Sequence, residues 1–161
     1  MTVHPDDMTL NNISVIFIAA SPERIWAALT DGGISPNYFM GSRVEVGDVG
    51  EDYGVFNGEQ RTVSGTVLVR DPPRRLRVTW NVPAPPGMKF PACEVEFEIE
   101  RAEAPKGGDV SKLTVCEFVD GPVPPKFQRA GRTGWALITS SLKSWLETGA
   151  AMPAVKLNPP E

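Results

Sequence analysis

A long amphipathic helix pattern near the end of the chain, at Phe127–Gly149, limits the fold more than any other feature of this sequence. Its apolar and small residues recur at alternating spacings of three and four, which is the period of one buried helix face. They are Phe127, Gly131, Gly134, Trp135, Ile138, Leu142, Trp145, Leu146 and Gly149. At about 1.5 Å per residue the helix reaches ~34 Å, enough to lie across a whole small sheet.

The segments before this helix alternate between strand patterns and glycine- or proline-rich turns, which predicts an antiparallel sheet. The strand candidates are Ile13–Ala20, Arg43–Val46, Tyr53–Phe56, Thr62–Arg70, Arg74–Trp80, Ala92–Arg101 and Val110–Val119. Within Cys93–Glu100, glutamates alternate with apolar residues, so one face is expected in water and the other in the core. The long helix is the available cover for the apolar face of the sheet.

Two short helices are expected after the first strand. Ser21 can cap a helix that starts at Pro22 and ends at Asp31-Gly32-Gly33, and a second short segment spans Ile34–Met40. One domain is expected at residues 12–150, between a mobile N-terminal tail at 1–11 and a C-terminal tail at 151–161.

Three segments together resemble a known family: ASPERIWAALTD (Ala20–Asp31), DPPRRLRVTW (Asp71–Trp80) and GWALITSSLKSWLETG (Gly134–Gly149). They resemble the domain shared by the activator of the ninety-kilodalton heat-shock protein ATPase and its single-domain homologues, within the START-like, or SRPBCC, superfamily. The resemblance implies an α+β helix-grip fold, in which a curved antiparallel sheet of about six to seven strands wraps around the C-terminal helix. It also implies an internal cavity, which in related branches takes lipids, sterols or aromatic polyketides.

Charge and composition argue against several classes of partner. The formal net charge of −4 disfavours nucleic acid and anionic membranes. No apolar run approaches the ~20 residues of a membrane helix. The two cysteines, and a start without the basic end or apolar run of a signal peptide, favour a reducing, cytoplasmic location.

No catalytic or metal-binding pattern stands out, so we expect no metal and no cofactor. His4 is the single histidine and falls in the expected tail, while Cys93 and Cys116 lack a CxxC-type spacing. Strand parity directs the two thiols to opposite faces, which argues against a disulfide. The glycines at Gly47–Gly54 and Gly131–Gly134 match neither a GxGxxG motif nor a P-loop.

Glu117 is the polar position of greatest functional interest. If Leu113 and Val115 face the core, the period of the strand turns Glu117 inward as well. A buried carboxylate has to pair with a cation, meet water or contact a ligand, because burying it alone is costly. The alternative is that the strand ends at this point and leaves Glu117 exposed.

The expected ligand-binding residues combine Glu117 with aromatic and apolar side chains of the sheet, the loops and the long helix. They are Phe39, Tyr53, Phe56, Trp80, Phe90, Glu117, Trp135 and Ile138. Tyr38 is a further candidate for a polar anchor. Pockets of this kind are mainly apolar with a few polar groups that orient the ligand.

We favour a non-catalytic protein that binds a small hydrophobic or amphipathic molecule between the sheet and the last helix, and we assign no catalytic residue. One alternative is an enzyme of the cyclase or aromatase type that uses the same cavity. Another is an interaction module related to the chaperone activators. The proline-rich loop Pro83–Pro91 would be a lid in the first two cases and a docking strip in the third. A homodimer fits a chain of this size and family.

Overall fold

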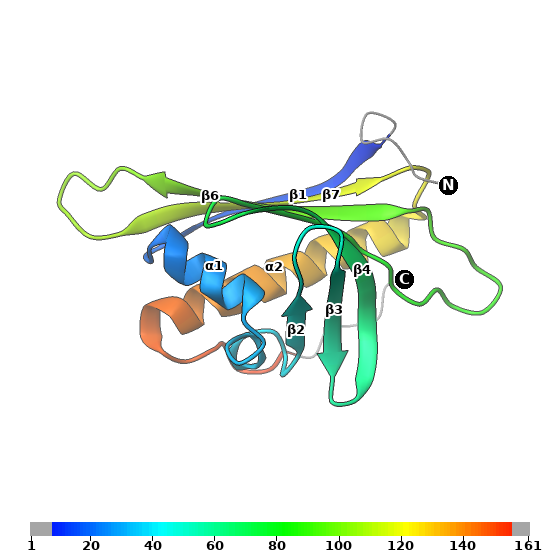
Figure 1. Ribbon diagram of the computed structural model, residues 1–161, viewed down its shortest axis with the longest axis horizontal. Coiled ribbons are helices and arrows are strands. Elements are labelled where there is room, and N and C mark those ends of the chain that lie inside the picture. Colours follow the sequence, from blue (N-terminus) through cyan, green and yellow to red (C-terminus); the bar gives the residue numbers. More distant parts are fainter. Residues whose placement is uncertain (1–7, 156–161) are drawn as a thin grey trace.

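The computed structural model describes residues 8–155, which form one antiparallel sheet with two α-helices against one of its faces (Figure 1). The elements are β1 (Thr9–Ile18), α1 (Pro22–Thr30), the 3₁₀ turn η2 (Ser35–Asn37), β2 (Arg43–Val46), β3 (Asp52–Asn57), β4 (Gln60–Asp71), β5 (Arg75–Thr79), β6 (Cys93–Ala102), β7 (Val110–Val119) and α2 (Pro125–Thr148). This order confirms the predicted helix-grip fold, including the two short helical segments after the first strand.

The seven strands follow the spatial order β1-β7-β6-β5-β4-β3-β2. From β2 to β7 each strand lies beside the next one in the chain, and β1 completes the sheet by pairing with β7 in the antiparallel sense. Figure 1 shows that β2, β3 and β4 curl away from the plane of the other strands, toward the side that the helices occupy. The sheet is therefore curved around its helical cover.

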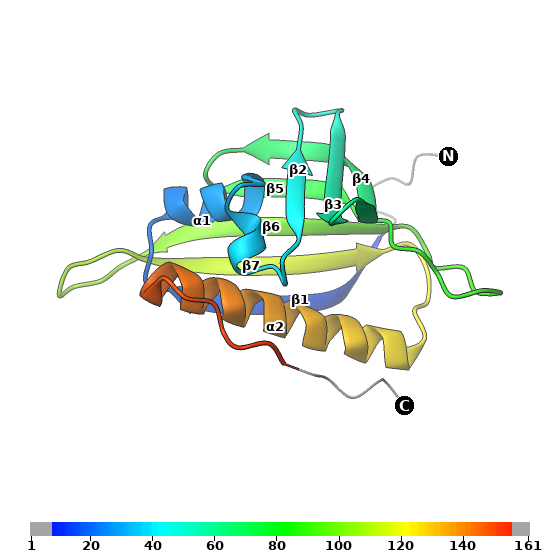
Figure 2. The ribbon, with the colours of Figure 1, turned by 90° about the horizontal axis from the view of Figure 1, so that it is seen from below.

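Helix α2 begins at Pro125, two residues before the predicted start, and ends at Thr148. Gly149 terminates it in the left-handed conformation, with φ of 82°, and its N–H donates to the carbonyl of Trp145 at 2.8 Å. Glycine is the residue that adopts this conformation without steric cost. Viewed from below, α2 runs alongside β1 at the edge of the sheet (Figure 2).

Helix α1 follows the predicted capping pattern. The Ser21 hydroxyl accepts a hydrogen bond from the backbone N–H of Arg24 at 3.2 Å, and Pro22 occupies the first turn. Its buried face carries Ile25, Ala28 and Leu29, which join the core beneath the sheet.

The first strand starts earlier than the sequence predicted. Residues 9–11 were assigned to the N-terminal tail, but Thr9 pairs with Val119 and Leu10 with Phe118, followed by an irregularity before Asn12. These residues are mostly polar, so the sequence does not indicate that they pair with β7. Residues 1–7, with His4, and residues 156–161 lie outside the described residues, and residues 151–155 contain neither helix nor strand.

The outer face of β6 differs from the solvated face that the alternation predicted. Glu98 and Glu100 are exposed as expected, but Glu94 is only 5% exposed. Arg77, from the neighbouring strand β5, pairs with Glu94 at 2.7 Å and lies over the ring of Phe118. Opposite charges on adjacent strands cover one another, which removes part of this face from water.

Candidate ligand pocket

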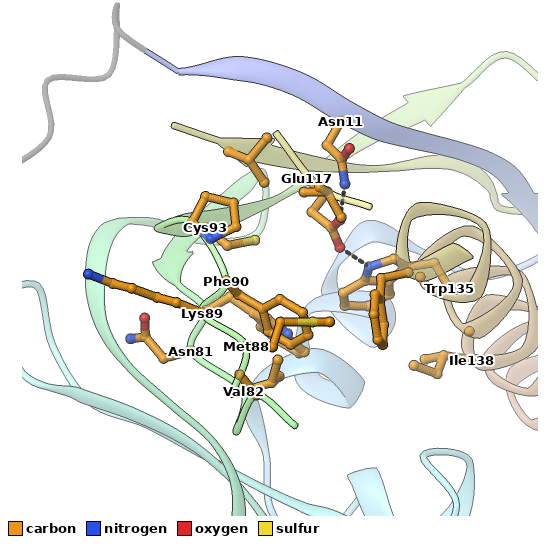
Figure 3. Close-up of a pocket in the computed structure, with 18 residues that line it drawn as sticks. Asn11, Asn81, Val82, Met88, Lys89, Phe90, Cys93, Glu117, Trp135 and Ile138 are labelled. Atoms are coloured by element: carbon orange, nitrogen blue, oxygen red, sulfur yellow. Dashed lines mark hydrogen bonds between the residues drawn. The ribbon is translucent and has the colours of Figure 1, made fainter. Parts of the chain in front are cut away.

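A pocket of about 450 Å³ opens at one end of the helix grip (Figure 3). Its walls are the first half of α2, the neighbouring ends of β6 and β7, and the loop that joins β5 to β6. The sheet and β1 contribute Asn11, Trp80, Cys93, Glu117 and Val119, and α2 with its approach contributes Val123, Phe127, Gly131, Gly134, Trp135 and Ile138. The loop contributes Asn81, Val82, Ala84, Met88, Lys89, Phe90 and Pro91.

Trp135 forms the inner wall of this pocket. Its ring lies 5.2 Å from that of Trp80 and 5.8 Å from that of Phe97, measured between ring centroids, and its side chain is 6% exposed. Aromatic pairs at these distances are favourable beyond the area that they bury. The cluster separates the pocket from the core behind it.

The space between the sheet and the second half of α2 is filled by side chains. The void on that side of Trp135 measures only about 10 Å³, between residues such as Tyr53, Phe97 and Leu142. A volume of this size is at the lower limit for one water molecule. The hollow therefore occupies one end of the interface between sheet and helix and does not run along the whole of α2.

Small residues on α2 create the hollow. A Cβ atom added at Gly134 would meet no heavy atom within 4 Å, and one added at Gly131 would lie 3.4 Å from Nδ2 of Asn12 and 3.8 Å from Oε1 of Glu117. Both glycines were recognised in the sequence as part of the apolar helix face. In the structure they leave space where larger side chains would fill it.

The loop between β5 and β6 covers the pocket with apolar side chains. Phe90 packs edge-to-face on Phe127 of α2, with ring centroids 5.3 Å apart. Val82 and Met88 also line the pocket while remaining partly exposed to solvent. The proline-rich loop thus touches the helix over the mouth of the pocket.

Glu117 faces the pocket, as the strand period predicted, and three N–H groups donate to its carboxylate. Oε1 accepts from Nδ2 of Asn11 at 2.7 Å and from Nδ2 of Asn12 at 3.3 Å. Oε2 accepts from the indole Nε1 of Trp135 at 3.1 Å (Figure 3). The alternative, in which the strand ends before Glu117 and leaves it exposed, is excluded by its pairing with Asn12 and Val95.

Hydrogen bonds with Gln128 hold in place the two asparagines that donate to Glu117. The side-chain Nε2 of Gln128 donates to the backbone carbonyl of Asn11 at 3.2 Å and to its side-chain oxygen at 3.0 Å. Nδ2 of Asn12 also donates to the carbonyl of Gln128 at 3.3 Å. These bonds tie the start of β1 to the first turns of α2, so the carboxylate sits in a preorganised environment.

The two cysteines face opposite sides of the sheet and are both free, in agreement with the parity argument. Cys93 lines the pocket, where burial and then the charges of Glu117 and Glu94 raise the pKa of its thiol to about 12. Burial also raises the pKa of Cys116, as do the nearby Glu96 and Glu98. Both side chains are therefore neutral thiols near pH 7.

The structure brings five of the eight predicted site residues together at the pocket: Trp80, Phe90, Glu117, Trp135 and Ile138. Phe39 and Tyr53 are instead buried in the filled core behind Trp135. Tyr38 is buried as well, and its hydroxyl donates to the carbonyl of Ala28 at 2.6 Å. Burial, with a smaller contribution from Tyr53, raises the pKa of Tyr38.

Phe56, another predicted site residue, does not line the pocket. Its ring lies on the outer face of β3, with the guanidinium groups of Arg43 and Arg61 at 4.8 and 5.5 Å from its centroid. Tyr53 and Val55 point inward. Because successive side chains of a strand alternate between its faces, Phe56, which follows Val55, points outward. Strand parity alone could have shown that Tyr53 and Phe56 do not share a face.

Sequence reasoning missed the contributions of Asn11, Cys93, Met88 and Phe127 to the pocket. Asn11 falls in the predicted tail, and Cys93 offers no spacing that marks it as a site residue. Met88 and Phe127 were visible as apolar residues beside prolines, but only the tertiary structure brings their segments together.

A model of the family described as "Activator of Hsp90 ATPase homolog 1-like protein" matches residues 19–147. No curated protein matches the chain. Among solved structures, the Aha1 dimer from Colwellia psychrerythraea is 22% identical, with a TM-score of 0.65, over 85% of this chain and 96% of that one. An HSP90 activator from Plasmodium falciparum is 17% identical, with a TM-score of 0.66, over 84% and 95% of the two chains.

DynU16, a protein of the dynemicin biosynthetic locus, is 23% identical with a TM-score of 0.69. The match covers 91% of this chain but only 49% of DynU16, so the chain spans about half of that protein. At these identities the solved structures show a common fold and nothing more about activity.

Proposed function

The chain belongs to the family of activator of Hsp90 ATPase homolog 1-like proteins, and on that premise we propose that it binds a small hydrophobic or amphipathic molecule without transforming it. The pocket beside Trp135, of about 450 Å³, carries this proposal. Its volume lies within the range of roughly 300–1,000 Å³ for small-molecule sites, and its lining is mostly apolar with few polar groups.

The two glycines of α2 that line the pocket support the proposal that a ligand occupies it. Glycine inside a helix costs about 1 kcal/mol relative to alanine, so Gly131 and Gly134 weaken α2 while leaving its pocket face open. A larger residue at Gly134 has room to enter the pocket. A ligand would restore the apolar contacts that the missing side chains do not make.

Filling the pocket at Gly134 tests this proposal. We expect Gly134→Leu to weaken binding of the neutral fluorescent probe N-phenyl-1-naphthylamine at least tenfold, because the new side chain takes the space of the probe. The matched control is Ala136→Leu, which adds a leucine at an exposed position of the same helix. Fluorescence titration of both variants and the wild type is the measurement. Equal affinities in all three would reject the pocket as the binding site.

A role as a chaperone-activating interaction module is a second candidate, favoured by the family match and by the shared fold of the Plasmodium falciparum activator. In that case the protein would act through its surface, and the loop Pro83–Pro91 is a candidate contact. Stimulation of the ATPase of an Hsp90 chaperone that persists in Gly134→Leu would support this function over ligand binding.

An enzyme of the cyclase or aromatase type is favoured by one observation, the presence of a carboxylate in the pocket. Glu117 is the one carboxyl group among the described lining residues, so it would have to move the proton in such a reaction. Mass spectrometry of a polyketide-like substrate incubated with the protein is the test. Product that forms with the wild type and not with Glu117→Gln would establish catalysis.

We also propose that the protein is cytoplasmic and forms a homodimer. Cys93 and Cys116 are free, which suits a reducing compartment. Within residues 8–155, neither helix combines the length and the apolar character that a membrane crossing requires. The outer face of β1 exposes about half of Ile13, Val15 and Phe17, and a second copy is our candidate for covering it, as the related Colwellia psychrerythraea protein is a dimer.

A further inference from the structure

The hydrogen bonds of Glu117 leave one of its acceptor positions open. A carboxylate has about four lone-pair directions, two on each oxygen. Oε1 accepts two hydrogen bonds, from Asn11 and Asn12, whereas Oε2 accepts a single one, from Trp135. All three donors belong to the protein and are neutral. Oε2 therefore retains a direction in which a ligand can donate.

The charge of this carboxylate has no cationic partner within the described residues. None of the ion pairs of residues 8–155 involves Glu117. Lys89 lines the mouth of the pocket, but it is exposed and Figure 3 shows its side chain directed away from Glu117. Arg132 reaches only the side-chain oxygen of Asn12, at 3.4 Å. The interior of the pocket thus carries one uncompensated negative charge.

The surroundings of Glu117 also favour a positive group. The rings of Trp80, Phe90, Phe127 and Trp135 line the same pocket, and the faces of aromatic rings attract cations. Cys93 adds no competing charge, because its thiol is protonated at neutral pH. Gly131 lies opposite Glu117 and Asn12 and has no side chain of its own, so it adds no bulk beside the carboxylate.

We propose that the ligand of this pocket is an amphipathic amine, whose apolar part lies among the aromatic rings and whose protonated nitrogen donates to Oε2 of Glu117. This inference deepens the proposed function and depends on it. An alcohol could donate to the same oxygen, but only a cation also compensates the negative charge of Glu117, so the ammonium group binds this carboxylate more strongly. A carboxylate head group would be repelled by Glu117, and Lys89, the one cation among the described lining residues, points away from this part of the pocket.

Three ligands that share a naphthyl group and differ in their head group test whether the pocket prefers an amine to an alcohol and an alcohol to a carboxylate. They are 2-(2-naphthyl)ethylamine, 2-(2-naphthyl)ethanol and 2-naphthylacetate, each titrated against the full chain loaded with the neutral probe N-phenyl-1-naphthylamine. With wild-type protein at pH 7 we expect the amine to displace the probe at a concentration at least tenfold lower than the acetate does, with the alcohol between them. This ranking needs no variant and decides the proposal even if a substitution at Glu117 impairs folding.

The substitution Glu117→Gln assigns the preference to this side chain. We expect it to weaken the amine about tenfold, to the level of the alcohol, and to weaken the uncharged probe by clearly less than that. Glu98→Gln is the matched control, since Glu98 is exposed on the outer face of β6. It should leave all three affinities unchanged.

Two results would overturn the inference while the proposed function stands. One is a neutral probe that binds while the three head groups displace it equally, and the other is an amine preference that survives Glu117→Gln. Failure of the neutral probe to bind, or binding that Gly134→Leu does not affect, would instead overturn the proposed function itself.

Discussion

At the scale of single residues, Trp135 and Trp80 are in contact with each other but have different surroundings. Their rings touch, yet Trp135 borders both the filled core and the pocket, while Trp80 is only half-buried on the pocket side. Trp135 also donates to Glu117, so it links the packing of α2 to the polar end of the site.

Truncation of the two tryptophans should therefore have unequal effects. We expect Trp135→Ala to lower the free energy of unfolding by about 3–5 kcal/mol, because it leaves a cavity beside the core. Trp80→Ala should cost clearly less, because its side chain already borders open space. Urea denaturation monitored by circular dichroism measures both values. Equal losses would mean that the pocket is filled in solution.

At the scale of secondary-structure elements, the end of α2 is joined to the end of β1 by side chains that bind backbone groups. Glu147 Oε2 accepts from the backbone N–H of Ala19 at 2.7 Å, and Lys143 Nζ donates to Glu147 at 2.7 Å and to the carbonyl of Phe17 at 2.8 Å. The edge of β1 is thereby partly capped by the helix, which blunts an exposed sheet edge.

This junction predicts a pH dependence of stability. The N–H of Ala19, and then Lys143, lower the pKa of Glu147 from its ordinary value of 4.5. The folded state therefore favours the ionised form, and the resulting stability is complete above pH 4.5 and is lost as the pH falls through the lowered pKa. We expect Glu147→Gln to reduce the free energy of unfolding at pH 7 by up to about 1 kcal/mol, since the group is largely exposed.

Urea midpoints measured between pH 7 and pH 3.5 test the prediction for Glu147. The difference between wild type and variant should shrink as the pH drops below 4.5. Glu59→Gln, at an exposed position in the turn between β3 and β4, provides the control and should show no such difference. A gap that stays constant with pH would show that the ionised form of Glu147 adds nothing to stability beyond what the neutral form supplies.

At the scale of the whole molecule, most of the architecture was predictable because it depends on local periodicity. The bounds of β2 and β7 match the predicted strands residue for residue, and α2 differs by two residues at its start. Parity could have shown that Tyr53 and Phe56 lie on opposite faces of β3, but not that Tyr53 is buried in the filled core. Asn11 could not be placed, because a polar pair at a strand end carries no apolar alternation.

The boundary of the pocket could not be derived from the sequence for a different reason. Whether a helix face packs solidly or leaves a hollow depends on how side chains from distant segments meet. Phe90 and Phe127 approach each other across a loop and a helix, and Gly134 faces open space only because of how α2 lies on the sheet. Periodicity identifies the buried face but not its filling.

The assembly state is also a property of the whole molecule. We expect the wild-type chain to sediment as a dimer at tens of micromolar, and Val15→Asp to sediment as a monomer, because two copies of a new charge would meet at the outer face of β1. Val49→Asp is the control, since Val49 is an exposed apolar residue in the turn between β2 and β3. Sedimentation velocity distinguishes these cases, and a monomeric wild type would contradict the prediction.

The wall formed by Trp135 has a consequence for how this protein can change over time. The filled core lies on one side of Trp135 and the pocket on the other. Substitutions around Gly131 and Gly134 can therefore change the shape of the pocket without disturbing the packing of the core. Ligand selectivity and folding stability can then evolve separately, so related proteins with this fold could come to bind different ligands.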